Sequence, residues 1–349
     1  MQITTMNKLY IITIALLFGS IPSRALMPST GCGLAPADQP GQTAERDILV
    51  DALARSYRLH LPAGYHTDTP TPLLLAFHGY TGTSASAEKS MQFSPHADEH
   101  GYIAVYPQAT FFDSAGTVIT SWNDLACNAS PGPAGPICAA DAYPYPFPPE
   151  CGTPDHCNWC TCHDDLAFVA ALLDSLENTL CIDLDRVYAT GMSNGGMLAH
   201  RLGCAMSDRF AAIAPVAGTL AKGFNCAPEL PISLMHIHGD NDIYVRVDGK
   251  QSSDGYLYEA IDDVVGKWAD KTSQHCATQT TPYPTSADGI KSMRCEQRAD
   301  CATGAEVVSC GWQGGHVWPA FGRDVIWNFF NRHSRGDDAL PRIDAPVPP

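Results

Sequence analysis

The sequence is poor in basic residues. Lys and Arg number 21 against 37 Asp and Glu among 349 residues, which gives a net charge of −16. The basic residues are not clustered, so the composition argues against nucleic acid or an anionic membrane surface as a partner. An acidic surface mainly increases solubility and identifies no substrate.

Long apolar runs are also scarce. The one extended run, Leu9–Phe18, is shorter than the roughly 20 residues that span a bilayer. Lys8 precedes this run and Ser23-Arg24-Ala25 follows it, which is the arrangement of a signal peptide with small residues at its cleavage point. We therefore expect residues 1–25 to be a signal peptide, and the mature protein to be secreted.

Internal repeats and a second apolar core are absent from the sequence, so we expect a single domain over residues 26–336 and a disordered Pro-rich tail at 337–349. Short apolar strands are predicted at 73–77, 103–106, 211–216, 232–237 and 306–310, after two strands within 47–61. Helical spacing predicts helices at 165–180, 256–270 and 325–332. This alternation favours an α/β fold, with a mostly parallel sheet covered by helices on both faces.

Cysteine, in contrast, is abundant. An even number, fourteen, in an exported chain predicts disulfides. Proximity in the expected fold favours Cys204 with Cys226, and Cys276 with Cys310. Six cysteines and a Pro-rich string lie within residues 123–163, which we predict to be a disulfide-stapled insertion. The insertion also contains a glycosylation sequon at Asn128, whose use depends on the organism.

The segment Cys157-x-x-Cys160-x-Cys162-His163 resembles a metal-binding pattern. It lacks the second matching pair that zinc spacing requires, and the expected compartment is oxidising. Thr161 stands where a haem-attachment motif has histidine. We therefore expect disulfides here, and neither a metal nor a cofactor.

The most informative segment is Gly191-Met-Ser-Asn-Gly195, which lies between a predicted strand at 186–190 and a predicted helix that reaches Cys204. Strand, G-x-S-x-G and helix together are typical of a nucleophile elbow, in which the serine is exposed at a sharp turn. Glycines on both flanks supply small size and permissive φ values. Without partners, the same pattern would be an ordinary turn in a Rossmann-like sheet.

A serine nucleophile needs a histidine base and a carboxylate that orients the base. Ser193, then Asp240 or Asp242, then His316 follow predicted strands in the order serine, acid, histidine. Asp240 directly follows Gly239 and could equally cap the turn. For the oxyanion hole, the backbone amides of Asn194 and Tyr80 are the expected donors.

The chain resembles the exported esterase family of α/β-hydrolases that includes feruloyl esterases and polyhydroxybutyrate depolymerases. The matching segments occur in the family's order between about residues 31 and 332. They are Gly31-Cys-Gly33, Arg55-Ser-Tyr-Arg-Leu-His-Leu-Pro62, Phe77-His-Gly79, Ser121-Trp-Asn123, Asp164-Asp165, Gly191-Met-Ser-Asn-Gly-Gly196, His238-Gly-Asp-Asn-Asp242 and Gly314-Gly-His-Val-Trp-Pro319. The resemblance implies the α/β-hydrolase fold, and it implies Ser193, Asp242 and His316 as the triad.

The function implied by this resemblance is a secreted serine esterase that needs no cofactor. Feruloyl-type carbohydrate esters of plant cell walls are the first expectation, and polyhydroxybutyrate or another polyester is the alternative. The rival from another class is an inactive hydrolase fold used for extracellular binding. We further predict that the insertion borders the active-site mouth. Its expected role is a substrate-binding aromatic wall beside Trp318, built from Trp122, Tyr143, Tyr145, Phe147 and Trp159.

Overall fold

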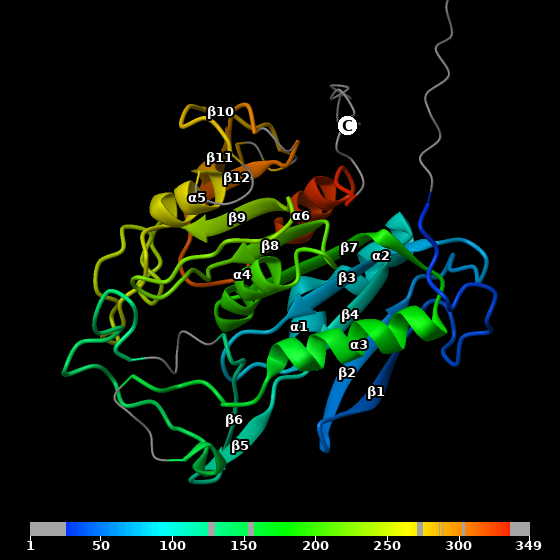
Figure 1. Ribbon diagram of the computed structural model, residues 1–349, viewed down its shortest axis with the longest axis horizontal. Helices are drawn as coiled ribbons and strands as arrows, with labels where there is room; N and C mark the ends of the chain where they lie inside the picture. The colour runs from blue at the N-terminus through cyan, green and yellow to red at the C-terminus, as the bar shows by residue number, and fades with distance from the viewer. Residues whose placement is uncertain are drawn as a thin grey trace, which may run out of the picture.

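A ten-stranded β-sheet forms the centre of the fold (Figure 1). The computed structural model describes residues 26–124, 130–152, 157–270, 275–285, 287, 289–301 and 304–335. The strand order is β1-β2-β4-β3-β7-β8-β9-β12-β11-β10. The central strands from β4 to β12 pair in parallel, and the strands outside them pair antiparallel. The expected mostly parallel sheet is confirmed.

The strands of this sheet are β1 (Gln42–Val50), β2 (Leu53–Leu61), β3 (Thr71–Phe77), β4 (Ile103–Pro107), β7 (Ile182–Met192), β8 (Ala212–Val216), β9 (Ser233–Gly239), β10 (Thr280–Pro282), β11 (Arg294–Arg298) and β12 (Val307–Trp312). The helices are α1 (Ser84–Met91), α2 (Phe93–His100), α3 (Asp165–Thr179), α4 (Asn194–Ala205), α5 (Ile261–Asp270) and α6 (Gly322–Phe330). Short 3₁₀ turns, η2 (Pro149–Cys151) and η3 (Ile290–Ser292), lie in the long connections.

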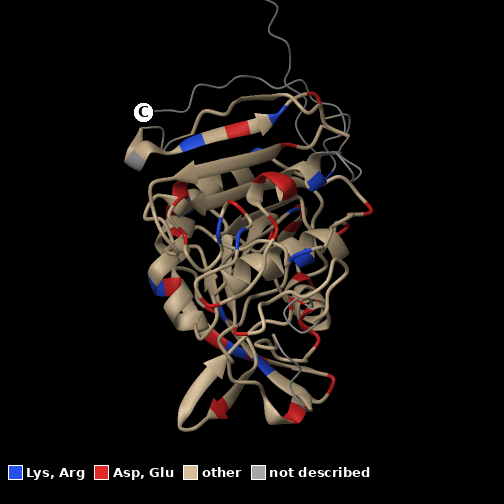
Figure 2. Cartoon of the chain, turned by 90° about the vertical axis from the view of Figure 1, so that its left-hand side faces the viewer, with Lys and Arg blue, Asp and Glu red and all other residues tan. Residues whose placement is uncertain are grey.

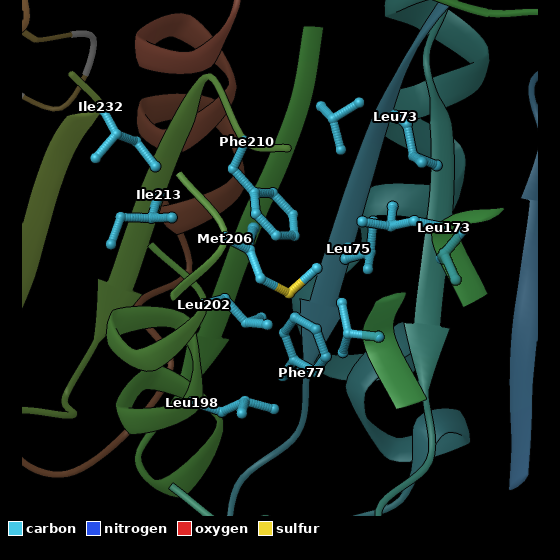
Figure 3. Packing of buried hydrophobic residues seen from close by; sticks show 14 of the residues in the cluster. Leu73, Leu75, Phe77, Leu173, Leu198, Leu202, Met206, Phe210, Ile213 and Ile232 are labelled. Carbon is cyan, nitrogen blue, oxygen red and sulfur yellow. The ribbon is translucent and has the colours of Figure 1, made fainter. Parts of the chain in front are cut away.

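The uninterrupted apolar sequence of β3 follows from burial on both faces. Leu73, Leu75 and Phe77 pack with α3, α4 and α5 on one face of the sheet. Figure 3 shows these three side chains with Leu173 of α3 and Leu198 and Leu202 of α4. Leu74 and Ala76 point to the other face and pack with α1, α2 and α6. Because successive strand residues alternate between faces, a strand between two helix layers must be apolar throughout.

Some elements differ from the expectations. The helix expected at 256–270 begins only at Ile261, because Tyr256 and Tyr258 form isolated bridges with Cys138 and Ala221. An unexpected hairpin, β5 (Phe111–Ser114) and β6 (Thr117–Thr120), precedes the insertion. Its two turn residues both have positive φ, 53° at Ala115 and 83° at Gly116. That conformation is the one a two-residue hairpin turn requires.

The disulfides confirm one expected pair and correct the other. Cys204 pairs with Cys226 as expected. The expected pair of Cys276 with Cys310 is wrong, since Cys276 pairs with Cys301 and Cys310 with Cys295. The reason is strand register: β11 and β12 run antiparallel, with Cys295 directly opposite Cys310. A further pair, Cys32–Cys181, ties the first described residues to the start of β7.

The insertion is stapled by disulfides, as predicted. Cys138 pairs with Cys157 and Cys151 with Cys162, and Cys160 is also disulfide-bonded. Cys151, Cys162 and His163 lie close enough together to suggest a metal site. Since a metal requires thiolates, the disulfide between the two cysteines removes them as ligands.

Charged residues are dispersed over the described part of the chain. In the view of Figure 2, Lys and Arg appear at scattered positions among Asp and Glu. Within the described residues, no helix combines the length and apolarity needed to cross a membrane. The predicted signal peptide, the sequon at Asn128 and the tail at 337–349 lie outside the described residues.

Candidate active site

Ser193 occupies a strained turn between β7 and α4. Its φ of 55° and ψ of −121° lie in a region that non-glycine residues rarely adopt. The turn is held by the Ser193 amide, which donates to the Val216 carbonyl at 2.8 Å. Although Ser193 is the N-cap of α4, its hydroxyl caps no backbone amide and remains available to another partner. This is the geometry of a nucleophile elbow.

The flanking glycines are required for space. A Cβ on Gly191 would lie 2.4 Å from the Gly195 carbonyl oxygen, and a Cβ on Gly195 would lie 2.4 Å from that of Phe77. The sequence reasoning also assigned permissive φ values to these glycines, which is wrong, because the positive φ falls on Ser193 itself. Close backbone approach between α4, β7 and β3 therefore explains both glycines.

Three side chains from separate loops form one hydrogen-bonded series. His316 follows β12, and its Nε2 lies 2.8 Å from the Ser193 hydroxyl oxygen. Its Nδ1 lies 2.7 Å from Oδ2 of Asp242, which follows β9. The loops meet because parallel strands deliver their carboxyl ends to one edge of the sheet. The carboxylate of Asp242 is fully buried and the imidazole of His316 is 18% exposed.

Of the two candidate acids, Asp242 is the one that reaches His316. Its Oδ1 accepts hydrogen bonds from the amides of Tyr244 and Val245, both at 2.9 Å. Burial alone raises the pKa of the Asp242 carboxyl, but hydrogen bonds from His238 and His316 outweigh burial and hold that pKa below its usual range. The carboxyl therefore stays ionised at neutral pH.

Asp240 has a different partner. Its two carboxylate oxygens each lie 2.8 Å from a guanidinium nitrogen of Arg294 on β11. This bidentate pair is partly exposed, with side-chain accessibilities of 28% for Asp240 and 62% for Arg294. Asp240 thus ties the loop after β9 to β11 and lies outside the hydrogen-bonded series.

Two backbone amides near Ser193 are those predicted as oxyanion donors, a role that stays a prediction. In the described chain, neither the Tyr80 amide nor the Asn194 amide donates to a protein acceptor. The Asn194 amide lies in the first turn of α4, where helix amides lack intrahelical acceptors. A Cβ on Gly79 would lie 3.4 Å from the Cβ of Ser193, so the loop that carries Tyr80 passes directly against the serine.

Trp122 is wrong as a substrate-binding residue. Its side chain is 0% exposed. The indole donates to the His78 carbonyl at 2.9 Å. The side-chain carboxamide of Asn194 accepts from the Trp122 backbone amide at 2.6 Å and donates to the Trp122 carbonyl at 3.0 Å. Trp122 therefore connects the loop after β3 to the start of α4 by hydrogen bonds.

A cavity of about 200 Å³ opens beside the series, lined by Tyr80, Tyr145, Trp159, Ser193, Met197, Tyr244, Val245, Asp254, Tyr258 and His316. Trp318 is not among these residues. It is partly exposed and packs edge-on against Phe93 with ring centroids 5.9 Å apart, so its predicted place beside the aromatic wall stays a prediction. The wall is formed by aromatic residues of the insertion and of the loops after β3 and β9.

The insertion borders the cavity, as predicted for its position. Tyr145 and Trp159 come from it, and each ring meets that of Tyr80 at 5.4 Å in a T-shaped contact. The other three aromatics named beforehand do not line the cavity, and Tyr143 is 58% exposed. Tyr145 also donates a hydrogen bond at 2.7 Å to Asp254, another residue that lines the cavity. Its influence on substrate choice stays a prediction.

Several cavity residues escaped the sequence reasoning. Met197 lies four residues after Ser193, one turn along α4, and helical spacing alone would have placed it near the serine. Tyr244 and Val245 directly follow Asp242, so the loop after β9 supplies the candidate acid and part of the wall. Asp254 and Tyr258 lie far from any motif, and nothing in the sequence pattern indicated them.

Comparison with known proteins identifies relatives. No protein-family model matches the chain. The chain is 28% identical over 295 residues to the putative esterase NocK of Nocardia uniformis subsp. tsuyamanensis, across 79% of this chain and 74% of that protein. It is 25% identical over 292 residues to feruloyl esterase B of Piromyces equi, covering 80% of this chain but 45% of that protein. It is 22% identical over 318 residues to a probable feruloyl esterase C of Aspergillus terreus, covering 89% and 94%.

A solved structure, the acetyl xylan esterase from Aspergillus awamori, matches with a TM-score of 0.50 at 14% identity, over 82% of this chain and 99% of that one. The parallel sheet, its two helix layers and this match define the α/β-hydrolase fold, as expected. Within that class, the sequence relatives confirm the resemblance to the esterase family that includes feruloyl esterases. These sequence relatives support a carboxylic ester hydrolase.

Proposed function

We propose that the protein is a secreted serine esterase that hydrolyses esters of aromatic acids, with feruloyl-type carbohydrate esters as its substrates. The observation that carries the proposal is the unbroken hydrogen-bonded series from Ser193 through His316 to Asp242, beside an aromatic-lined cavity. Names of relatives support the substrate class, since several are feruloyl esterases. The described disulfides support secretion, because such bonds persist in oxidising compartments.

The proposed mechanism follows from the two sides of His316. The ionised Asp242 accepts a hydrogen bond from the Nδ1–H group, which leaves Nε2 with its lone pair toward the Ser193 hydroxyl. Nε2 takes the hydroxyl proton as the serine oxygen attacks the ester carbonyl, and it returns that proton to the leaving alcohol. A water then repeats these steps on the acyl-enzyme. The amides of Tyr80 and Asn194 stabilise the oxyanion in both stages.

The cavity favours a small aromatic acyl group. Its volume of about 200 Å³ lies below the range usual for drug-sized ligands. Tyr80, Tyr145 and Trp159 provide flat apolar surface on one side, so a planar aromatic acid would contact their rings.

One observation favours the alternative, a polyester depolymerase. Ile243 and Val317 directly follow Asp242 and His316 in the chain, and they are 53% and 51% exposed. Tyr244, which lines the cavity, is 46% exposed. Exposed apolar side chains beside the site would suit contact with an apolar polymer surface.

A substrate panel tests the proposal. Purified protein is assayed with methyl ferulate, p-nitrophenyl acetate and polyhydroxybutyrate film, with Ser193→Ala as the matched control. We expect hydrolysis of the first two, no turnover by the folded control, and labelling of Ser193 by an organophosphate. Release of hydroxybutyrate as the main activity would establish the alternative. Failure to hydrolyse any ester, with Ser193 unlabelled, would indicate the inactive binding protein.

A further inference from the structure

Three buried histidines form a chain behind Asp242. The Nε2 of His200 on α4 lies 3.3 Å from Nδ1 of His236 on β9. The Nε2 of His236 lies 3.0 Å from Nδ1 of His238, two residues further along β9. The rings of His236 and His238 are 5.3 Å apart and nearly parallel, at 5°. The three residues are each at most 1% exposed, so their rings are buried away from solvent.

At one end of this chain of histidines, the direction of the hydrogen bond is fixed. The indole Nε1 of Trp268 on α5 lies 3.2 Å from Nδ1 of His200. An indole N–H can only donate, so Nδ1 of His200 must accept. In a neutral imidazole the proton then sits on Nε2, from which His200 donates to His236.

The other end requires the same direction. Nε2 of His238 lies 2.7 Å from the Val245 carbonyl oxygen and 3.2 Å from Oδ2 of Asp242. Both of these atoms are acceptors, so Nε2 of His238 must carry a proton. Neutral His238 then accepts at Nδ1, which requires His236 to donate from its own Nε2. The two ends therefore select one and the same arrangement, with every proton on Nε2.

Burial keeps the inner members neutral. It lowers the pKa of His200 to about 3 and the pKa of His236 well below its usual range. A neutral imidazole has one donor and one acceptor, and this arrangement uses both on every ring. His200 has one further partner, the Gly218 backbone, whose hydrogen bond raises the pKa of His200 against the effect of burial. A chain that is satisfied at both ends has a single low-energy proton arrangement, because any reversal places two donors or two acceptors face to face.

We propose that His238 is a positioning residue for the acid of the active site, and that His236, His200 and Trp268 hold His238 in its donating tautomer. The proposal rests on the roles proposed above for Asp242 and His316. Oδ2 of Asp242 accepts a hydrogen bond from His316 at 2.7 Å, and Nε2 of His238, which donates to the Val245 carbonyl, lies 3.2 Å from the same oxygen. Together with the two amides on Oδ1, the contact with His238 fixes the plane of the carboxylate. That plane determines where Nδ1 of His316 binds.

Breaking the chain at its middle has a defined consequence. Without a donor from position 236, Nδ1 of His238 has no hydrogen-bond partner, and its ring is no longer held in the orientation in which Nε2 faces the Val245 carbonyl and Asp242. A rotated ring withdraws its N–H group from Asp242, so the carboxylate loses a contact that aligns it with His316. His236 and His200 do not line the substrate cavity, so substrate binding should be unaffected.

The first experiment compares three variants with p-nitrophenyl acetate. His236→Phe keeps a ring but removes both hydrogen bonds. We expect kcat to fall roughly ten- to a hundredfold with KM unchanged, the scale of one hydrogen bond to a charged group. His236→Gln retains a donor toward His238 and should recover most of kcat. His60→Phe is the matched control, since His60 is a buried β2 histidine that hydrogen-bonds Thr43 and Asp98, and its kcat should equal that of the wild type.

A folded His236→Phe with wild-type kcat would overturn the proposal, as would equal losses in the Phe and Gln variants. The second experiment needs no variant to be active. Long-range ¹H–¹⁵N correlation spectra of histidine-labelled wild-type protein distinguish the two neutral tautomers, and signals are assigned by single substitution. We expect His200, His236 and His238 all to be neutral with the proton on Nε2 at pH 7. An Nδ1-protonated or charged ring at any of the three positions would refute the proposed proton arrangement, whether or not the protein proves to be an esterase.

Discussion

Replacing Asp242 by Asn tests the candidate site most sharply, because the structure dictates how the new amide would lie. Oδ1 of Asp242 accepts from the backbone amides of Tyr244 and Val245. In Asp242→Asn the amide oxygen must take that place, so the NH₂ group faces the position of Oδ2. There it would point at Nδ1 of His316 and Nε2 of His238, which both donate in the wild type.

The consequence is a wrong tautomer of His316. To avoid two opposed donors, Nδ1 of His316 must accept from the new amide, and the proton moves to Nε2. Nε2 then no longer accepts from the Ser193 hydroxyl at 2.8 Å. We expect kcat for p-nitrophenyl acetate at pH 7 to fall by about 10⁴-fold, the scale of the corresponding change in a serine protease. This corresponds to about 5.4 kcal/mol of lost transition-state stabilisation.

Asp240→Asn is the matched control for this experiment. The change touches the same loop and loses one charge, but its pair with Arg294 is partly exposed and lies outside the series. We expect kcat within about threefold of the wild type, because exposed ion pairs contribute about 1 kcal/mol or less. Both variants are assayed after circular dichroism confirms folding. A larger loss in Asp240→Asn than in Asp242→Asn would refute the assignment.

Three further outcomes are expected. Asp165→Ala leaves the 3%-exposed Arg55 without its partner at 2.6 Å; urea unfolding should show a loss of about 3–5 kcal/mol, and a loss under about 1 kcal/mol would contradict a structural role for this pair. Tyr145→Leu removes the bond to Asp254 and one aromatic wall, and should change the ratio of kcat/KM for methyl ferulate to that for p-nitrophenyl acetate; an unchanged ratio in a folded variant would end the case for the insertion in substrate choice. Because the folded-state pKa of Asp242 is lowered, its contribution to stability should be present above pH of about 4 and lost below it; wild-type unfolding free energy should therefore fall more steeply below that pH than that of Asp242→Asn.

Several of the sequence segments shared with the esterase family prove to be structural. Asp164 caps α3 by accepting from two amides of its first turn. Asp165 is fully buried, pairs with Arg55 of β2 and accepts from the Asn123 amide at 2.7 Å. Three segments far apart in the sequence thus meet in one buried cluster. Motif order alone could not separate this cluster from the chemistry, which is why Trp122 beside it was assigned to the substrate.

The sequence by itself determined those features that depend on local chain chemistry. The apolar run at 73–77, the serine between two close-packed glycines and the order serine, acid, histidine each follow from neighbouring residues and element order. They correctly predicted the α/β sheet, and the structure places Ser193, Asp242 and His316 together at one edge of it. An insertion rich in cysteine likewise predicted disulfides within residues 123–163.

Tertiary structure alone decided which side chains face the cavity and which partners the remaining cysteines take. Trp122 directly precedes the insertion and Trp159 lies within it, but the first is buried against Asn194 and the second lines the cavity. Cys310 pairs with Cys295 because antiparallel register aligns them. The chain from Trp268 to Asp242 joins α5, α4 and β9. Its members are ordinary buried residues in sequence, since only packing gives each imidazole a donor on one side and an acceptor on the other.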